Sequence, residues 1–294
     1  MFGLDKFGGI GLHRIQRFFE SEGIDLAQLS RRSLVITGTN GKGSTAHLTA
    51  SALGAHGLKV GVFTSPHMFD LRERFLLGGE QIDSETLDRL STRVLAFNDT
   101  LPADDQLGAF QFLFLVAVLW FEETAPDAIV WEAGIGGRYD PVRMVRAQIG
   151  AVTSVELEHT EVLGGTEELI AYDKVDAVAP GGTVLLSPLV PASLRTRLET
   201  YSSLSNRKLA CIPDSRTIED VKHSSDGTSF RLSARDEPDR TIQLSMIGEH
   251  QAYNAVTAER LAHGWLTASG RSFDAEACWR AISAVRIPGR LERI

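Results

Sequence analysis

The sequence predicts an α/β protein built on a mostly parallel sheet with helices on both faces. Short apolar runs, each long enough for one buried strand, alternate with longer helix-like segments along most of the chain. A glycine-rich turn joins the first of these strands to a helix, and further polar blocks follow other strands. Because ligands of such sheets bind at the carboxyl ends of the strands, these polar blocks mark the expected functional edge.

The predicted elements follow one another in a regular order. Strands are expected where a few apolar residues come together, and helices where apolar residues recur every three or four positions. The expected strands are 34–36, 59–63, 128–131, 149–153 and 183–186. The expected helices are 45–53, 83–98, 107–123 and 167–178, with 250–269 and 274–284 near the end of the chain.

The pattern changes from about Thr228 onward. Segments 230–234 and 241–245 alternate apolar and polar residues, and the charged segment 235–240 separates them. Alternation with a period of two is typical of antiparallel strands. The sequence therefore predicts a small antiparallel hairpin beside the parallel sheet.

Composition narrows the class of protein further. The chain has 294 residues, of which 43% are hydrophobic, and its net charge is 30 − 38 = −8, which argues against a nucleic-acid surface. The two cysteines, Cys211 and Cys278, have no metal-ligand spacing and fit a reducing cytoplasm. The longest apolar run, 112–121, is too short for a membrane helix, and the N-terminus lacks a signal-peptide pattern. We therefore predict a cytoplasmic protein.

The most informative motif is the glycine-rich turn after the strand at 34–36. Residues 37–44 are Thr-Gly-Thr-Asn-Gly-Lys-Gly-Ser. Backbone N–H groups of such a turn, together with the positive end of the following helix, bind phosphate oxygens. Lys42 would lie near the terminal phosphates, and the hydroxyl of Ser44 or Thr45 would reach Mg²⁺. An ordinary strand-to-helix turn is the alternative.

The spacing of this turn differs from that of the common phosphate-binding loop. Ile36 stands where the first glycine is expected, and Gly43 stands where Ser or Thr follows the lysine. The run Gly-Thr-Asn-Gly-Lys-Gly-Ser instead resembles the ATP loop of the Mur ligase superfamily, specifically of the folylpolyglutamate synthase/dihydrofolate synthase family. This resemblance implies a P-loop NTPase-like fold and a set of ATP-binding residues, with Lys42 also catalytic. The implied residues are Thr39, Asn40, Gly41, Lys42, Gly43, Ser44 and Thr45.

A second block, Thr64-Ser65-Pro66-His67 with Glu73-Arg74, is similar to a signature of the same family. The resemblance implies that Ser65 is a metal ligand and that His67 and Arg74 lie near the substrate. A proline-containing turn with a solvated charge pair is the alternative.

A third block covers 131–140 and reads Trp-Glu-Ala-Gly-Ile-Gly-Gly-Arg-Tyr-Asp. A carboxylate at the end of a buried strand is a suitable Mg²⁺ ligand, because Mg²⁺ takes one or two carboxylates together with phosphate oxygens and water. The resemblance likewise assigns Glu132 to the metal and places Asp140 on the substrate side. Alternatively, Glu132 caps its own loop.

Two further residues gain a role from the resemblance. The block 158–164, Glu-His-Thr-Glu-Val-Leu-Gly, is similar to the family's Asp-His-Thr-Glu-Phe-Leu-Gly, which implies that His159 is catalytic and binds a second Mg²⁺. Two such ions would neutralise the phosphates and an acyl phosphate. Lys174 matches a catalytic lysine that the family carbamylates. The alternatives are a structural histidine and a surface helix lysine.

The last matching blocks lie near the end of the chain. Segment 248–255 resembles Gly-X-His-Gln-X-X-Asn-Ala, and segment 288–292 resembles Pro-Gly-Arg-Leu-Glu. The resemblance implies that Asn254 touches the nucleotide and that Arg290 reaches its phosphates. Helix capping is the alternative for His250 and Gln251, and it is compatible with nucleotide binding.

The resemblance as a whole implies an ATP-dependent amide ligase. Such an enzyme converts a carboxylate to an acyl phosphate, which the amine of L-glutamate attacks, and the acceptor is dihydropteroate or tetrahydrofolate. The sequence departs from the family near the substrate at Gln111, at Val142-Arg143 and at Val175-Asp176. These departures leave open a related Mur-type ligase that acts on another carboxylic acid.

The resemblance also bears on domain organisation. Residues 1–294 match a central ATP-binding domain with a short N-terminal substrate segment, and the family's C-terminal ligase domain is expected to be absent. We expect this chain to bind ATP but to ligate poorly alone, because domain closure protects an acyl phosphate from water. The alternatives are a separate chain that carries the other domain and a non-catalytic ATP-binding subunit or paralogue. Neither a nucleic acid nor a membrane is an expected partner.

Overall fold

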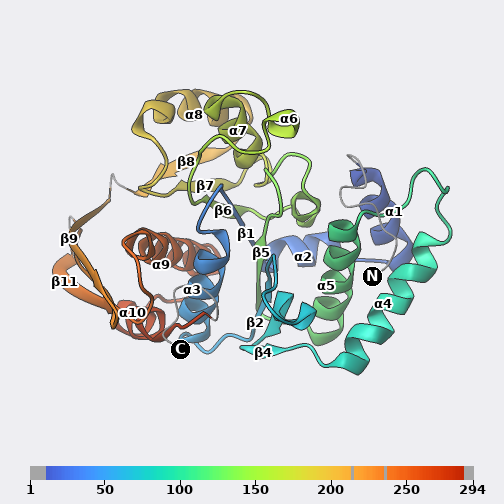
Figure 1. The fold of residues 1–294 in the computed structure, drawn as a ribbon, viewed down its shortest axis with the longest axis horizontal. Coiled ribbons are helices and arrows are strands. Elements are labelled where there is room, and N and C mark those ends of the chain that lie inside the picture. Colours follow the sequence, from blue (N-terminus) through green and yellow to red (C-terminus); the bar gives the residue numbers. More distant parts are fainter. Residues whose placement is uncertain (1–10, 213–214, 235–236, 288–294) are drawn as a thin grey trace.

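The computed structural model describes residues 11–212, 215–234 and 237–287, and within them it forms one large and one small sheet (Figure 1). The large sheet has eight strands in the order β4-β3-β2-β5-β1-β6-β7-β8. Six of them, from β2 to β8 in that order, are parallel, while β3 and β4 form an antiparallel edge. The strands are β1 Ser33–Thr37, β2 Val60–Phe63, β3 Phe75–Leu77, β4 Glu80–Gln81, β5 Ala128–Glu132, β6 Ile149–Val152, β7 Thr183–Leu186 and β8 Lys208–Cys211.

Helices cover both faces of this sheet, which confirms the predicted α/β class (Figure 1). The α-helices are α1 Leu12–Glu22, α2 Leu26–Arg32, α3 Lys42–Gly54, α4 Ser84–Asn98, α5 Ala109–Thr124, α6 Thr160–Leu163, α7 Glu167–Val175, α8 Ala192–Leu204, α9 His250–Ala268 and α10 Ala275–Ala284. Two short 3-10 helices, η1 Leu71–Arg74 and η2 Pro141–Val145, complete the described helices.

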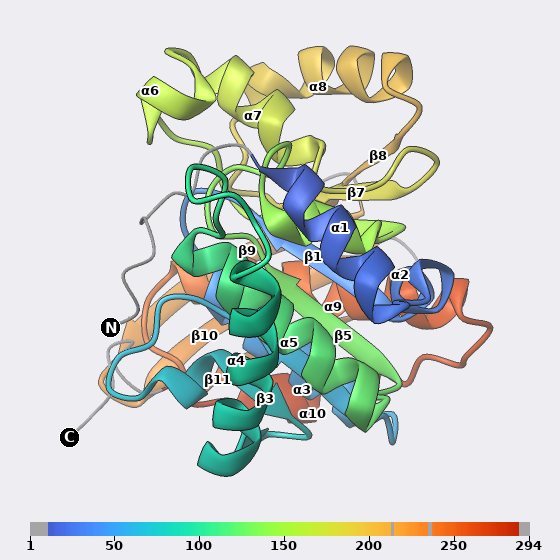
Figure 2. The ribbon, with the colours of Figure 1, turned by 90° about the vertical axis from the view of Figure 1, so that its right-hand side faces the viewer.

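Alternating strand residues divide the interior into two cores. Val35 of β1 and Trp131 of β5 point to the face covered by α1, α4 and α5. Leu34, Ile36 and Val130 point to the opposite face, which α3, α9 and α10 cover. Figure 2 shows α4 and α5 in front of the sheet and α3, α9 and α10 behind it. Since both faces are buried, the central strands β2, β5, β1 and β6 are mostly apolar instead of alternating.

Several boundaries differ from the prediction. The helix α3 begins at Lys42, three residues before the predicted start, so the lysine belongs to the helix itself. The helix α7 ends at Val175, not at 178. The prediction missed α1, α2 and α8, the edge strands β3 and β4, and β8, because these elements are short or carry many polar residues.

The small sheet is antiparallel and has the order β11-β10-β9. The predicted hairpin is confirmed as β10 Gly227–Ala234 and β11 Glu237–Leu244. The predicted turn was too long, because β11 already begins at Glu237, and residues 235–236 lie outside the described residues. A third strand, β9 Arg216–Ser224, was missed because most of its side chains are polar. One face of this sheet joins the core of α3, α9 and α10, where Phe230 and Trp279 pack edge to face.

Within the described ranges, we find no helix with both the length and the apolar character that a membrane crossing requires.

Candidate active site

The parallel register brings the polar blocks to one edge of the large sheet. Ile36 of β1 pairs with Glu132 of β5, and Phe63 of β2 pairs with Trp131. The glycine-rich turn, the segment that begins at Thr64, and Glu132 therefore follow three adjacent strands at the same end. β6 lies on the other side of β1 and leads into the segment that contains His159.

The glycine-rich turn has the geometry of a phosphate cradle. Gly38 and Gly41 adopt positive φ angles of 145° and 83°, which favour glycine. Gly41 is the N-cap of α3, so the free N–H groups of the first helical turn face the same space. The Lys42 ammonium donates to the carbonyl oxygens of Gly38 at 2.7 Å and Thr39 at 2.9 Å. The positive charge of Lys42 thus lies over the turn. An anion bound there would accept from the ammonium in place of the two carbonyl oxygens.

The hydroxyl groups expected near the metal lie on the first turn of α3. Ser44 is 1% exposed, Thr45 is fully buried, and Gly43 is buried beside them. The Thr45 Oγ1 atom has no hydrogen-bond partner within the described part of the chain. Because a buried hydroxyl without a partner is costly, this atom indicates a ligand at the turn.

The segment after β6 forms hydrogen bonds with the glycine-rich turn on one side. The Thr153 hydroxyl donates to the Asn40 carbonyl at 2.6 Å, and the Asn40 N–H donates to Ser154 Oγ at 2.9 Å. Asn40 Nδ2 also donates to Glu156 Oε1 at 3.1 Å. A Cβ atom added at Gly38 would lie 1.9 Å from Thr153 Oγ1, so the close packing requires glycine there. Glu156 was not predicted, because it stands in no motif of its own.

Helix α9 contacts the turn from the other side. Asn254 is fully buried, and a Cβ atom added at Gly41 would lie 2.5 Å from its Oδ1 atom. The structure therefore brings Asn254 to the predicted nucleotide site. The capping alternative for His250 and Gln251 is wrong, because the N-cap of α9 is Glu249 and no side chain caps this end. Arg290 lies outside the described residues.

Glu132 is a buried carboxylate at the end of β5. It is 2% exposed, and its Oε2 atom accepts a hydrogen bond from the Ser65 N–H at 2.9 Å. This hydrogen bond joins Glu132 to the neighbouring segment that begins at Thr64. Two predicted metal ligands, Ser65 and Glu132, are thus in direct contact.

The segment after β2 is ordered by side chains. Glu73 accepts hydrogen bonds from the backbone N–H groups of Met68, Phe69 and Asp70. The Arg74 Nε–H donates to His67 Nδ1 at 2.9 Å. The alternative of a solvated Glu73–Arg74 pair is therefore wrong. Burial lowers the pKa of the Arg74 guanidinium, and the negative charge of Glu132 opposes that shift. Arg74, predicted near the substrate, therefore lies within electrostatic reach of Glu132, the predicted metal ligand.

The glycine-rich loop after Glu132 is held by two aspartates. Asp140 Oδ2 accepts from the N–H groups of Gly134 and Ile135, and its Oδ1 accepts from Val142. Asp173 of α7 accepts from Gly137 at 2.7 Å and from the next residue. Asp140, predicted on the substrate side, thus stabilises its own loop. The sequence analysis missed Asp173, although its place beside Lys174 was the available signal.

Asp140 should make the stability of the protein depend on pH in a defined direction. Burial raises its pKa from the usual 3.8 to about 6, against the three N–H donors. A raised folded-state pKa means that the contribution to folding is complete below about 3.8 and is lost as the pH rises through about 6. Its size is at most ~3 kcal/mol. In urea unfolding, the wild type should lose stability relative to Asp140→Asn between pH 4.5 and pH 7; parallel curves would contradict this.

Lys174 is fully buried, so the alternative of a surface helix lysine is wrong. Its ammonium donates to Glu158 Oε1 at 2.5 Å. Burial lowers the pKa of Lys174, the Glu158 carboxylate opposes that shift, and the charge of Lys42 adds to it. The charge of Lys42 also acts on Asp140. These mutual effects place Lys174 and Asp140 in the electrostatic neighbourhood of the phosphate turn.

His159 lies at the N-cap of the short helix α6 with a left-handed φ of 42°. Its side chain is 42% exposed, and Glu161 is its ion-pair neighbour at 3.9 Å. Among the described residues, no group of three or more His, Cys, Asp or Glu side chains could hold a metal ion. His159 and Glu132 thus belong to no such group of three, and a Mg²⁺ ion here would take further ligands from phosphate and water.

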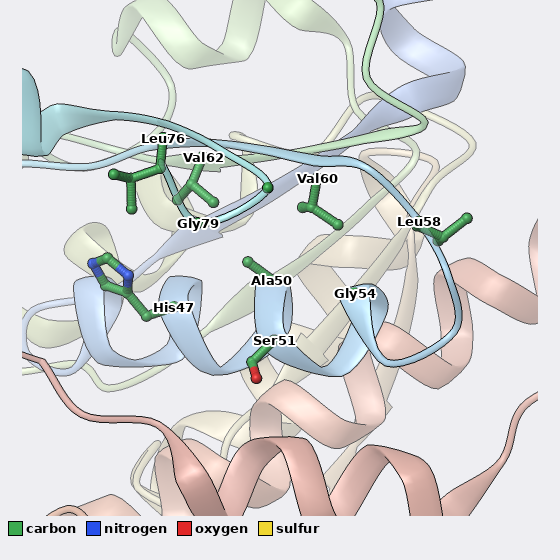
Figure 3. A pocket seen from close by; sticks show the side chains of 10 residues that line it. His47, Ala50, Ser51, Gly54, Leu58, Val60, Val62, Leu76 and Gly79 are labelled. Atoms are coloured by element: carbon green, nitrogen blue, oxygen red, sulfur yellow. The ribbon is translucent and has the colours of Figure 1, made fainter. Parts of the chain in front are cut away.

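A separate hollow of about 420 Å³ lies along α3 (Figure 3). Val60 and Val62 of β2 and Leu76 of β3 form one wall, and α3 contributes His47 and Ser51. No acidic side chain, lysine or arginine of the described chain lines it, so it lacks the chemistry of a nucleotide–metal site. The strand ends remain the candidate site.

A parallel sheet with this turn at the carboxyl end of a central strand defines a nucleotide-binding protein of the P-loop class. Comparison with known proteins narrows the class. No protein-family model matches the chain. A probable bifunctional folylpolyglutamate synthase/dihydropteroate synthase of Halobacterium salinarum is 33% identical over 264 residues, which are 87% of this chain and 31% of that protein.

Solved structures that resemble this chain come from the same family as this relative. A structure described as an FPGS-AMPPCP-folate complex has a TM-score of 0.86 and 26% identity, covering 99% of this chain and 70% of that one. A bifunctional folylpolyglutamate synthase/dihydrofolate synthase with Mn, AMPPNP and L-glutamate bound has a TM-score of 0.76 and 26% identity, covering 97% and 64%. The chain belongs to the folylpolyglutamate synthase/dihydrofolate synthase family of the Mur ligase superfamily. It spans 30% to 63% of the length of these and similar curated relatives.

Proposed function

We propose that this chain forms the ATP-binding part of an ATP-dependent amide ligase. ATP would convert the carboxylate of a dihydropteroate or tetrahydrofolate acceptor to an acyl phosphate, and the amine of L-glutamate would displace the phosphate. The carrying observation is the cradle, where the Lys42 ammonium, the orphaned Thr45 hydroxyl and the buried Glu132 carboxylate share one sheet edge. Relatives described with AMPPCP, folate and L-glutamate support the substrate classes.

The residues present fit bound Mg²⁺, which would neutralise phosphate charge when it is bound. Glu132 would supply a buried carboxylate to one ion, and Ser65 with Ser44 or Thr45 would supply hydroxyl oxygens to it. His159 would supply a ring nitrogen to a second ion on the exposed side. The carboxylate lies at a strand end beside the phosphate turn, as a metal shared with phosphate requires. His67 and Arg74 would then face the acceptor, on the segment that Glu73 orders.

The test of this function is ADP formation by the purified 294-residue chain. The assay contains Mg-ATP and L-glutamate, with dihydropteroate or tetrahydrofolate added or omitted, and the product mass is read alongside. Because the isolated chain is expected to ligate poorly, the expected result is slow ADP formation that depends on the acceptor and yields a glutamylated product. Acceptor-independent ADP without any glutamylated product would contradict the proposal.

A related ligase that acts on another acid is the second candidate, and Gln111 favours it. Gln111 is 5% exposed, and its Oε1 atom accepts from the buried Arg14 at 3.3 Å and from the Gly108 N–H at 3.1 Å. A neutral amide stands here where the family usually has a carboxylate, so the charge of Arg14 is balanced by Asp105. A panel of pterin and non-pterin acceptors in the same assay separates the two candidates.

We also propose that Lys174 is carbamylated in the active protein. The lowered pKa favours the neutral amine, which attacks CO₂ to form a carbamate and releases one proton. Because the product is an anion, the Glu158 carboxylate must turn away from its present contact. With ¹³C-bicarbonate and Mg-ATP, we expect one labelled carbamate in the wild type and none in Lys174→Met. Full turnover by a protein without label would overturn the proposal.

A further inference from the structure

One buried amide beside the phosphate turn has a fixed orientation. The Nδ2 group of Asn254 donates to Gln251 Oε1 at 3.0 Å. Its Oδ1 atom therefore faces Gly41, where an added Cβ atom would lie 2.5 Å away. Asn254 is fully buried, and Oδ1 accepts no hydrogen bond from the residues that the structure describes. The site thus presents a desolvated hydrogen-bond acceptor next to the turn.

Gln251 is the residue that fixes this orientation. It is 2% exposed, and its Nε2 atom lies 3.1 Å from His250 Nε2. With the Nε2 atom of His250 unprotonated, the Gln251 NH₂ group donates to it, and Gln251 Oε1 is left to accept from Asn254 Nδ2. A flip of Asn254 would set two oxygens against each other and break this hydrogen bond.

We infer that Gln251 is a positioning residue for nucleotide specificity, because it makes Asn254 present an acceptor to the bound nucleotide. The inference rests on the proposed ATP binding. Phosphate oxygens carry no donor at neutral pH, so the acceptor selects another part of the nucleotide. The donors that a nucleotide offers are the exocyclic amino group of the base and the ribose hydroxyls.

The affinities of four nucleotides for the 294-residue chain test this inference. They are ATP, ITP with a carbonyl oxygen in place of the amino group, and 2′-deoxyATP and 3′-deoxyATP without one hydroxyl. In the wild type, calorimetry should show that one of the three analogues binds about 10-fold more weakly than ATP. The analogue that is rejected identifies the donor.

The decisive variant is Gln251→Met, which lets Asn254 turn. The ratio of the dissociation constant of the rejected analogue to that of ATP should then fall about 10-fold. Gln251→Glu should keep the wild-type ratio, because its carboxylate oxygen still accepts from Asn254 Nδ2. Gln243→Met on the exposed face of β11 is the matched control. Equal ratios in the wild type and Gln251→Met, or equal loss in both Gln251 variants, would overturn the inference. Absence of ATP binding by the wild type would instead refute the proposed function.

Discussion

Replacing Lys42 by alanine should weaken ATP binding by about 10- to 100-fold, because a charge-assisted hydrogen bond contributes about 1.5–3 kcal/mol. The effect on ADP formation should be larger, about 100- to 1000-fold, since the ammonium would also stabilise charge that develops on the transferred phosphate. The geometry behind this is the position of the Lys42 ammonium over the turn, 2.7 Å from the Gly38 carbonyl oxygen. Calorimetry measures the first effect, and a coupled ADP assay measures the second.

The control for this variant is Lys59→Ala. Lys59 precedes β2 at the opposite edge of the sheet, and its ammonium contacts the Thr124 carbonyl oxygen at 3.3 Å. The control removes the same charge far from the turn and should leave both measurements unchanged. If Lys42→Ala turned over ATP as fast as the control, the phosphate-cradle interpretation would fail.

Glu132→Gln should lower ATP turnover by about 100-fold or more and raise the Mg²⁺ concentration needed for half-maximal rate. The substitution keeps an oxygen that can accept the Ser65 N–H bond, so the fold at the end of β5 is retained. What is lost is the negative charge beside the phosphate turn. Affinity for ATP without Mg²⁺ should change little, and this difference separates a metal ligand from a structural carboxylate.

Glu122→Gln provides the matched control for the metal prediction. Glu122 pairs with Arg32 at 2.5 Å, at the edge of the sheet where β1 begins. A Mg²⁺ titration of the three proteins should shift only for Glu132→Gln. Equal Mg²⁺ dependence in the wild type and Glu132→Gln would remove Glu132 from the metal site. His159→Ala in the same titration reports on the second predicted ion.

The sequence predicted the sheet because its strands are buried on both faces and are therefore apolar throughout, as β1 and β5 are. It did not predict β9, whose exposed side chains are mostly polar, nor β3 and β4, which have only three and two residues. Short edge elements carry too few residues for a periodic pattern, and their pairing depends on strands that are distant in sequence.

Some residues of the candidate site could likewise be predicted from the sequence, and others could not. Local motifs identified Lys42, Glu132 and Asn254 because each stands at a strand end or helix start within a recognisable run. Other contacts at the site join residues whose pairing no local run reveals. Glu158 reaches Lys174 across 16 positions, and the contact of Asn40 with Glu156 spans 116. Residues that meet only after folding leave no spacing in the sequence that could reveal them.

The sequence by itself determined the fold class and the glycine-rich turn, because both depend on local chemistry: apolar strands, and glycine at positive φ. The family followed from the resemblance of its motifs. Only the tertiary structure decided the environment of the charged groups. Burial of Lys174 and Asp140, and the orphaned Oδ1 of Asn254 facing Gly41, arise from packing between segments that are distant in the sequence. Desolvation and hydrogen-bond partners are set by all the packed neighbours of a side chain, and these come from distant parts of the chain.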